Sequence, residues 1–270
     1  MQNLYYFFIK INIERRLQAQ HSTNKKAGRI MNREIFLTIV VPVFNEAQRI
    51  APFLTDVAEY VNRCTFSCEV LLVDDGSTDQ TIPLVKSLLE RHVPGMYRIE
   101  HLERNQGKGG ALRKGMLSAR GRYILFLDAD GSTAISELDT FIPAIKEDYD
   151  IYIAVRTKKH AAPFKRKLFG YGYIFLANGI LGMRVSDFTC GFKCYSQQAA
   201  RTVFSRQRLN NWSFDAEDLY IAKKFGFRNR EIPVYWKHVG DSKVKVFKNV
   251  IVCGFDLLKI RINGLLGLYR

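Results

Sequence analysis

The sequence has 270 residues, of which 47% are hydrophobic and 25% are charged. This length suits one large α/β domain with short appendages and is too small for two full domains. The 41 basic residues outnumber the 26 acidic ones and give a formal net charge of +15, which favours an anionic partner such as a phosphorylated substrate, an anionic lipid surface or nucleic acid. The five cysteines do not follow the paired spacing of a zinc site, so we expect reduced thiols in a cytosolic protein.

Two segments carry much of the excess positive charge. Residues 156–167 hold six basic side chains and no acidic one, and residues 237–270 hold seven basic side chains and two acidic ones. No run of about 18 or more apolar residues occurs, which argues against a membrane-spanning helix. The first segment, 1–34, is apolar and then basic, the reverse of a secretory signal, and we interpret it as an N-terminal extension.

Strand and helix patterns alternate along the first half of the chain, as in a parallel sheet with crossover helices. The predicted strands are 36–43, 69–73, 97–102 and 123–127, and the predicted helices are 49–62, 78–91 and 111–119. The second half is mixed, with predicted strands 151–155 and 230–235, helices 168–181 and 214–225, and a polar turn 187–192. Polar clusters follow the early strands, and the carboxyl ends of strands in an open α/β sheet share the edge where ligands bind. The sequence therefore predicts one domain, 35–243, with one site.

A pair of carboxylates directly follows the fourth predicted strand. Asp128 and Asp130 are separated by one alanine after the apolar segment 123–127, so both can turn toward one hard cation such as Mg²⁺ or Mn²⁺. Diphosphate oxygens and water would supply the other ligands, and the metal would neutralise charge on a departing nucleoside diphosphate. Asp-x-Asp pairs are common in proteins, and it is the position after a buried strand that favours a metal site here.

Two further polar segments follow the second and third predicted strands. Asp74 and Asp75 precede Gly-Ser-Thr, which is typical of a turn and a helix cap, yet two carboxylates exceed what a cap requires, and one can accept hydrogen bonds from a base or ribose. The glycine-rich segment 105–111 does not match the Walker phosphate loop. Its backbone N–H groups and Lys108 can still bind an anion, and a plain tight turn is equally compatible.

These segments, in this order and spacing, resemble the family 2 glycosyltransferases with the nucleotide-diphospho-sugar transferase (GT-A, Rossmann-like) fold. The resemblance covers nearly all of residues 35–270 and is strongest to the polyprenyl-phosphate (dolichyl-phosphate) glucosyltransferases and mannosyltransferases. It implies an α/β fold with a mostly parallel central sheet flanked by helices. The motifs that carry it are VPVFNE at 41–46, VDDGSTD at 73–79, GKGGA at 107–111, FLDADG at 126–131, DFTCGFK at 187–193, FDAE at 214–217 and GDSK at 240–243.

The resemblance implies roles for individual residues. It gives Asp128 and Asp130 the metal, and Ser132 stands where the mannosyl branch often has Gln as a further ligand. Phe44 would offer an aromatic wall to the base of the nucleotide. The candidate residues for binding the nucleotide-sugar donor are Pro42, Phe44, Glu46, Asp74, Asp75, Lys108, Ala129, Lys237 and Lys243.

Two arginines are implied at the acceptor. Arg156 has the place of the Arg in the family's Gly-Ser-Arg motif, and Arg166 has the place of a later basic residue at the acceptor phosphate. The chain departs from the family pattern twice. Ala154-Val155 replaces Gly-Ser, and Lys237 stands where the mannosyl branch commonly has Arg, whose bidentate fork Lys cannot reproduce.

The nature of the acceptor decides which catalytic groups are needed. A phosphate monoester has a second pKa of about 6, so it is largely dianionic at neutral pH and needs no strong base; the basic run 156–167 would align it. A sugar hydroxyl, as in polysaccharide or glycolipid synthesis, would need a carboxylate base, for which Asp215, Glu217 and Asp218 are the candidates. These acids also have a purely structural interpretation, because acidic side chains in the first turn of a helix interact favourably with the helix dipole. Direct displacement inverts the anomeric configuration by either route.

The C-terminal segment, 244–270, is predicted to form an amphipathic basic helix. One face would hold Lys245, Lys248, Asn249, Asp256, Lys259 and Asn263, and the remainder is apolar. Such a helix suits an anionic membrane surface, although its apolar side could instead pack on the domain, and Gly254 could break it. We therefore expect a peripheral protein on the cytoplasmic face of a membrane.

The expected reaction is transfer of a hexose from a nucleotide sugar to a polyprenyl or dolichyl phosphate. The motifs TCGFK at 189–193 and FDAE at 214–217, and the absence of Gln after Asp130, favour glucose and UDP-glucose over mannose and GDP-mannose. A nucleotidyltransferase would carry a Gly-x-Gly-Thr-Arg loop where 44–46 stands. A non-catalytic module that binds sugar nucleotides or nucleic acid would not need Asp128 and Asp130, and we expect no nucleic-acid partner.

Overall fold

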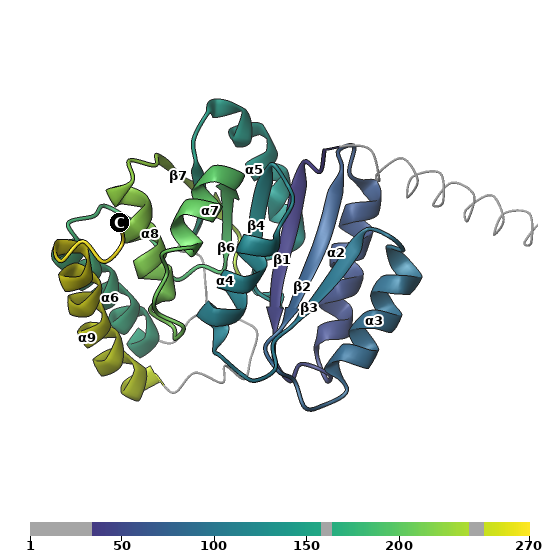
Figure 1. Cartoon of the computed structure of the whole chain (residues 1–270), viewed down its shortest axis with the longest axis horizontal. Coiled ribbons are helices and arrows are strands. Elements are labelled where there is room, and N and C mark those ends of the chain that lie inside the picture. The colour runs from purple at the N-terminus through teal and green to yellow at the C-terminus, as the bar shows by residue number, and fades with distance from the viewer. Residues whose placement is uncertain (1–33, 158–163, 238–245) are drawn as a thin grey trace, which may run out of the picture.

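A seven-stranded sheet crosses the molecule, with strand order β3-β2-β1-β4-β6-β5-β7 (Figure 1). The computed structural model describes residues 34–157, 164–237 and 246–270, and all side chains in these ranges except those of 146, 164–169 and 246–251. The strands are β1 Leu37–Val43, β2 Cys68–Asp74, β3 Tyr97–His101, β4 Tyr123–Leu127, β5 Ile151–Arg156, β6 Phe192–Ser196 and β7 Asn229–Val234. The helices are α2 Ile50–Arg63, α3 Thr81–His92, α4 Lys108–Ser118, α5 Leu138–Ala144, α6 Phe164–Leu181, α7 Gln197–Phe204, α8 Phe214–Lys224 and α9 Val246–Leu265, with single 3-10 turns at Ile135–Glu137 and Ile145–Glu147.

The strand register brings the predicted polar clusters to one edge. β1 pairs in parallel with both β2 and β4, and Val43 at the end of β1 lies beside Asp74 at the end of β2. β6 runs antiparallel between β4 and β5, with Phe192 opposite Leu127. β6 therefore starts at the edge at which β4 ends, and the segment before β6 lies at that edge beside Asp128. The predicted mostly parallel sheet is confirmed, with β6 as its antiparallel member.

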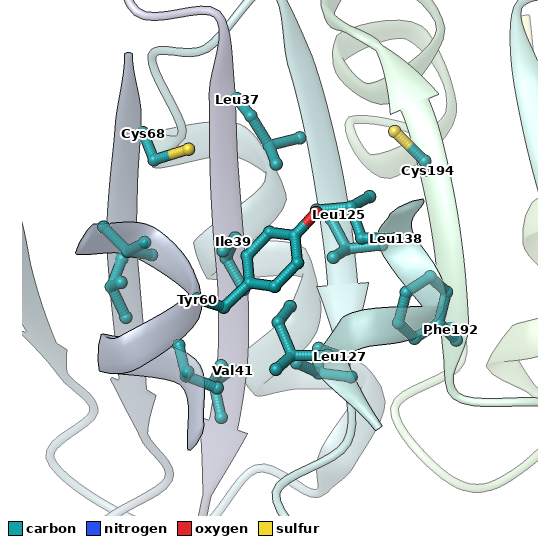
Figure 2. Close-up of a cluster of buried hydrophobic side chains, with 14 of the residues drawn as sticks. Leu37, Ile39, Val41, Tyr60, Cys68, Leu125, Leu127, Leu138, Phe192 and Cys194 are labelled. Atoms are coloured by element: carbon teal, nitrogen blue, oxygen red, sulfur yellow. The ribbon is translucent and has the colours of Figure 1, made fainter. Parts of the chain in front are cut away.

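Both faces of the sheet are covered by helices, which explains why its central strands β1, β2 and β4 are largely apolar. One face packs against α2, α3 and α5, and the other packs against α4, α6, α7, α8 and α9. Alternate residues of each strand serve the two faces, so that Ile39 and Leu125 lie on the first and Val40 and Ile124 on the second. Figure 2 shows part of the first core, where Tyr60 of α2 lies over Ile39 and Leu125.

Three elements of the second half were not among the predictions. α5, β6 and α7 occupy stretches for which the sequence pattern predicts no helix or strand, and the polar turn 187–192 runs directly into β6. Gly254 does not break the predicted C-terminal helix, because α9 continues through that position. The predicted N-terminal extension lies outside the described residues except for Glu34.

Helices α6 and α9 pack against each other at the end of the molecule far from α3 (Figure 1), and α9 also contacts α8. The C-terminal segment is thus packed on the catalytic domain rather than separate from it. Among the helices that the structure describes, none combines the length and the apolar character needed to cross a bilayer.

Candidate active site

The loops after β1 and β2 are locked together at the sheet edge. The Asn45 N–H donates to Ser77 Oγ at 2.9 Å, and Asn45 Oδ1 accepts from the Thr78 N–H at 2.9 Å. The Glu46 N–H donates to Thr81 Oγ1 at 2.8 Å, which fixes the chain just before α2. These bonds hold Phe44 with 37% of its surface exposed, in keeping with its predicted place beside a nucleotide base. Pro42, in β1, is half-buried.

Asp75 organises the glycine-rich turn. Its Oδ1 accepts from the Gln106 N–H at 2.7 Å and its Oδ2 from the Gly107 N–H at 3.0 Å. Burial raises the pKa of this carboxyl, and the two N–H donors partly offset the increase. Asp75 thus has a structural role in addition to the predicted contact with the nucleoside, which stays a prediction.

Asp74 lies wholly inside the same edge. Its carboxylate accepts from the Ser77 N–H and lies 2.6 Å from His101 Nδ1. The side chain has no exposed surface and braces the loop after β2; its predicted contact with the donor stays a prediction.

The glycine-rich turn places Lys108 beside Asp128, one of the two predicted metal ligands. α4 begins at Lys108 rather than at the predicted residue 111, and Gly107 before it has φ 87°, a conformation that favours glycine. Lys108 Nζ lies 2.7 Å from Asp128 Oδ1 and 5.2 Å from the centroid of the Trp212 ring. Burial alone would lower the pKa of Lys108, but the carboxylates of Asp128, Asp215 and Asp130 outweigh it and raise the pKa. The lysine is therefore a firmly charged cation.

Asp128 is held from two sides. Its N–H donates to the Gly191 carbonyl at 3.0 Å, and its carboxylate lies directly against Gly191, where a Cβ atom would fall 2.0 Å from Asp128 Oδ2. Burial is the largest influence on the pKa of Asp128 and raises it; Lys108 acts in the opposite direction, and the charge of Asp130 adds to the increase. The raised pKa means that the surroundings disfavour the negative charge of this carboxylate, and a bound cation would offset that effect.

The donor set fits a hard divalent cation. Asp130 is exposed, and its Oδ1 accepts from the Ser132 N–H at 2.9 Å. Among the described residues no three or more His, Cys, Asp or Glu side chains are grouped so that they could hold a metal ion by themselves. The protein would therefore offer Asp128, Asp130 and, as predicted, Ser132, and leave the other positions to phosphate oxygens and water, as Mg²⁺ and Mn²⁺ prefer. Ala129, between the two acids, is half-buried.

The loop that follows Asp128 and Asp130, the predicted metal ligands, contacts the segment after β7. The Lys237 N–H donates to the Ser132 carbonyl at 2.8 Å, and Thr133 forms an antiparallel bridge with Trp236. Lys237 is thereby brought next to the predicted metal ligands, as its predicted contact with the donor requires. Lys243 lies outside the described residues.

Arg156 ends β5 and is clamped by the motif that precedes β6. Its Nε lies 2.6 Å from Asp187 Oδ2, and one terminal nitrogen lies 2.8 Å from Asp187 Oδ1 and 2.7 Å from Thr189 Oγ1. The guanidinium also lies 5.5 Å from the centroid of the Trp236 ring. The bidentate pair with Asp187 fixes the orientation of Arg156, and Asp187 is a residue for which the sequence alone gave no role. The side chain of Arg166, in the first turns of α6, is outside the described set.

The three candidate bases are buried. Asp215 forms an ion pair with Lys193. Glu217 Oε2 accepts from the N–H groups of Arg208 and Leu209 at 2.9 and 2.7 Å, and its Oε1 accepts from the Tyr269 hydroxyl at 2.7 Å.

Asp218 adds to the same pattern. Its Oδ1 has no hydrogen-bond partner in the described part of the chain, and burial raises its pKa well above the ordinary value, helped by the charges of Glu217 and Asp215. None of the three carboxylates offers an open, unengaged face to an acceptor hydroxyl. The contacts of Glu217 in particular are those of a brace between α8 and the C-terminal turn.

Replacement of Glu217 by Gln tests this interpretation. The Gln carbonyl can accept both backbone N–H bonds and its amide can donate to the Tyr269 hydroxyl, so we expect transfer within about twofold of wild type, whereas loss of a general base costs about 10²- to 10⁴-fold. Glu217→Ala, which leaves the buried donors of Leu209 and Tyr269 and the N–H of Arg208 unpaired, should lower the free energy of unfolding by about 1–3 kcal/mol or more. Steady-state rates and thermal melts measure the two effects. A loss of 100-fold or more in the Gln variant with unchanged melting would restore the base role.

Comparisons with known proteins agree with this geometry. The family model "Glycosyl transferase family 2" matches residues 38–204. The dolichyl-phosphate beta-glucosyltransferase of Saccharomyces cerevisiae is 34% identical over 261 residues, which are 88% of this chain and 78% of the relative. The enzyme of the same name from Dictyostelium discoideum is 32% identical over 251 residues, 87% of this chain and 77% of the relative.

Two solved structures share the fold. Mannosyl-3-phosphoglycerate synthase from Rubrobacter xylanophilus aligns with a TM-score of 0.65 at 14% identity, over 89% of this chain and 77% of that one. Glucosyl-3-phosphoglycerate synthase from Mycobacterium tuberculosis, solved with Mn²⁺, UDP and glucosyl-3-phosphoglycerate, aligns with a TM-score of 0.60 at 14% identity, over 84% of this chain and 80% of that one. The predicted GT-A fold is confirmed. The chain belongs to the family 2 glycosyltransferases and is a hexosyltransferase.

Proposed function

We propose that this enzyme transfers glucose from UDP-glucose to dolichyl or another polyprenyl phosphate, with inversion and with Mg²⁺ or Mn²⁺. The observation that carries the proposal is the contrast at the sheet edge: the candidate bases Asp215, Glu217 and Asp218 are buried, whereas Asp130 is exposed beside Lys108 and Lys237. A phosphate acceptor needs no proton removed, so a site without an accessible base suits it better than it suits a sugar hydroxyl. The names of the 30–35% identical relatives support the same acceptor and sugar.

The residues of the chain divide the work between the two substrates. Phe44 and Glu46 would bind the nucleoside, and Lys237 and Lys243 would hold the diphosphate. Asp128 and Asp130, with Ser132, would hold the metal, which supplies charge neutralisation at the leaving diphosphate when it is bound. Lys108 keeps the charge of Asp128 compensated at 2.7 Å, so that the carboxylate stays in place before the donor arrives.

The acceptor phosphate has its own cations. Arg156, fixed by Asp187, and Arg166 would align the phosphate oxygen with the anomeric carbon. Alignment and stabilisation of the leaving group are then sufficient for displacement, which inverts the anomeric centre.

The Arg166→Ala variant tests the acceptor side. We expect the KM for the lipid phosphate to rise by about tenfold or more, because one charge-assisted contact contributes about 1.5–3 kcal/mol, while the KM for the nucleotide sugar stays within about twofold. Arg184→Ala, which removes an exposed arginine from the turn after α6, is the matched control. An unchanged KM for the lipid phosphate in the Arg166 variant would reject the assignment.

A screen of donors tests the sugar and the nucleotide. The enzyme is incubated with each of UDP-glucose, GDP-mannose, UDP-galactose and UDP-N-acetylglucosamine in the presence of polyprenyl phosphate and Mn²⁺. Lipid-linked sugar should form fastest with UDP-glucose. Preference for GDP-mannose would leave the reaction class intact and overturn the choice of sugar.

The membrane partner is proposed from the outer face of α6 and α9. Large apolar side chains are exposed there, with Phe175 at 79% and Phe255 and Leu265 at 70% each. The set, which we call the α6–α9 apolar face, consists of Tyr171, Phe175, Leu176, Val252, Phe255, Leu258, Ile262, Leu265, Leu266 and Leu268.

The helix α9 turns part of its predicted polar face inward. Asp256 and Asn263 are buried, as are the apolar Leu257 and Ile260, and Asp256 Oδ2 accepts from Ser213 Oγ at 2.7 Å and from Asn211 Nδ2 at 2.8 Å. Many other apolar side chains of α9 are exposed, together with Lys259 and Arg261. An exposed apolar surface flanked by cations fits the headgroup region of an anionic bilayer. We propose that the enzyme works as a peripheral protein on the cytoplasmic face of a membrane.

Vesicle binding tests the α6–α9 apolar face. The double variant Phe255→Ser/Leu265→Ser removes two exposed anchors and should weaken binding to vesicles with anionic lipid by about tenfold or more, since a buried Phe or Leu contributes about 1.5–3 kcal/mol. Its melting temperature should not fall, because neither side chain is part of the core. Leu117→Ser, an exposed apolar residue on α4, is the control. Equal sedimentation of the double variant and wild type would remove this face from the proposal.

A further inference from the structure

A buried lysine next to the active site has no part in the chemistry proposed above. Lys193, in β6, is only 1% exposed, and its ammonium forms an ion pair with Asp215 and donates to the Cys190 carbonyl at 3.0 Å. Desolvation of a lysine and an aspartate is costly, and a buried pair often stabilises a fold no more than apolar residues of similar volume would. Stability alone therefore does not explain why the Lys193–Asp215 pair is buried next to the active site.

The carbonyl that Lys193 holds belongs to the turn that carries Gly191. The Gly191 carbonyl accepts from the Asp128 N–H at 3.0 Å, and the Asp128 carboxylate lies against the same glycine, with no room for a Cβ atom. β4 and β6 are paired so that Lys193 lies opposite Phe126. The lysine thus fastens the turn on one side, and the turn fixes both the backbone and the carboxylate of Asp128 on the other.

We infer that Lys193 is a positioning residue for the metal ligand Asp128, acting through the Cys190-Gly191 turn, with Asp215 as the residue that holds the ammonium in place. We assign Lys193 no catalytic role, since its ammonium is buried and is engaged by Asp215 and the Cys190 carbonyl. Partners of this kind beyond the ligands commonly change metal affinity or activity by about 10- to 100-fold when they are removed. The inference rests on the proposed metal site at Asp128 and Asp130.

A merely structural ion pair and a positioning residue respond differently to removal of both charges. Lys193→Met leaves Asp215 buried without a partner, so it should lower the melting temperature whichever role the lysine has. Lys193→Met/Asp215→Leu replaces the pair by apolar side chains and should recover the melting temperature. It does not restore the hydrogen bond to the Cys190 carbonyl, so the turn stays unfastened.

The experiment measures Mn²⁺ binding in the presence of UDP by electron paramagnetic resonance, alongside thermal melts of the same samples. We expect the double variant to melt within a few degrees of wild type and to bind Mn²⁺ about tenfold more weakly or worse. Lys223→Met is the matched control, because Lys223 also donates to a backbone carbonyl, that of Gly182, but away from the site; it should bind Mn²⁺ as wild type does. Since binding is measured without turnover, any role of Asp215 in the chemical step does not enter.

The outcomes separate this inference from the proposed function. A double variant that regains both the melting temperature and the Mn²⁺ affinity of wild type would show that the pair is only structural and would overturn the positioning role. Wild-type enzyme that binds no Mn²⁺ with UDP would overturn the metal site itself and the positioning role with it. A double variant with restored melting and weakened Mn²⁺ binding supports the inference.

Discussion

Asp130→Ala should lower sugar transfer on the order of 1000-fold at saturating Mn²⁺, because a metal at the leaving group stabilises the transition state by several kcal/mol. Asp130 is the more exposed of the two predicted carboxylate ligands, and the bond in the described structure that its side chain loses is the one from the Ser132 N–H. The free energy of unfolding should therefore change by no more than about 0.5 kcal/mol, as for other surface substitutions. Loss of activity without loss of stability is the result expected for a residue that binds the metal.

The measurement compares initial rates over a range of Mn²⁺ concentrations with thermal melts of the same preparation. Asp56→Ala, an exposed aspartate on α2, serves as the control and should retain the wild-type rate. If Asp130→Ala transfers sugar within about tenfold of wild type when Mn²⁺ is saturating, the residue does not hold the metal and the assignment of the pair fails.

Gly191→Ala is the second substitution for which we expect a large effect. The added methyl group would fall 2.0 Å from Asp128 Oδ2, a distance that two non-bonded atoms do not tolerate, so the Asp128 carboxylate must rotate away. Displacement of one ligand should weaken Mn²⁺ binding by about 10- to 100-fold and lower the rate at limiting metal at least as much. The fold should persist, since the atoms that must move are those of one carboxyl group and not of the backbone.

Gly179→Ala provides the control for this variant. Gly179 lies in α6, and a Cβ atom there meets nothing within 4 Å, so Ala should stabilise the helix by about 0.5–1 kcal/mol without any effect on metal binding. Titration of each variant with Mn²⁺ in the presence of UDP measures the difference. Wild-type affinity in Gly191→Ala would mean that the Asp128 carboxylate does not need its present position.

The sheet could largely be predicted from the sequence, because helices cover both of its faces. β1, β2 and β4 are largely apolar runs that lead into polar segments, and this pattern has few interpretations other than a buried parallel strand. β6 escaped prediction because it is short and carries Lys193 in a fully buried position. The ammonium of that lysine forms an ion pair with Asp215, a residue 22 positions away, so the strand has no local signal.

The sequence offers candidate residues for the site but not the contacts among them. The spacing of Asp128 and Asp130 indicates a metal pair, whereas the approach of Lys108 and Gly191 depends on the order of strands across the sheet. That order is not determined by sequence spacing. The partner of Arg156 illustrates the same point, since Asp187 reaches it from the segment before an antiparallel strand.

The C-terminal helix shows a further limit of periodicity. Its sequence separates a polar stripe from an apolar side, but the pattern does not say which side meets the domain. Asp256 and Asn263 turn inward because hydrogen-bond partners such as Asn211, Ser213 and Tyr269 are available inside. The buried side of α9 therefore combines these polar residues with Leu257 and Ile260, and many other apolar side chains of the helix are exposed.

Glucose transfer to dolichyl phosphate is the measurement that tests the central claim most directly. The enzyme is incubated with radiolabelled UDP-glucose and Mn²⁺ and with either dolichyl phosphate or unphosphorylated dolichol in anionic vesicles, and label in the organic phase is counted. We predict lipid-linked label with dolichyl phosphate, and none with dolichol or when a chelator removes the metal. Equal labelling of dolichol, or no labelled lipid with dolichyl phosphate, would contradict the account of a phosphate acceptor at a site without a base.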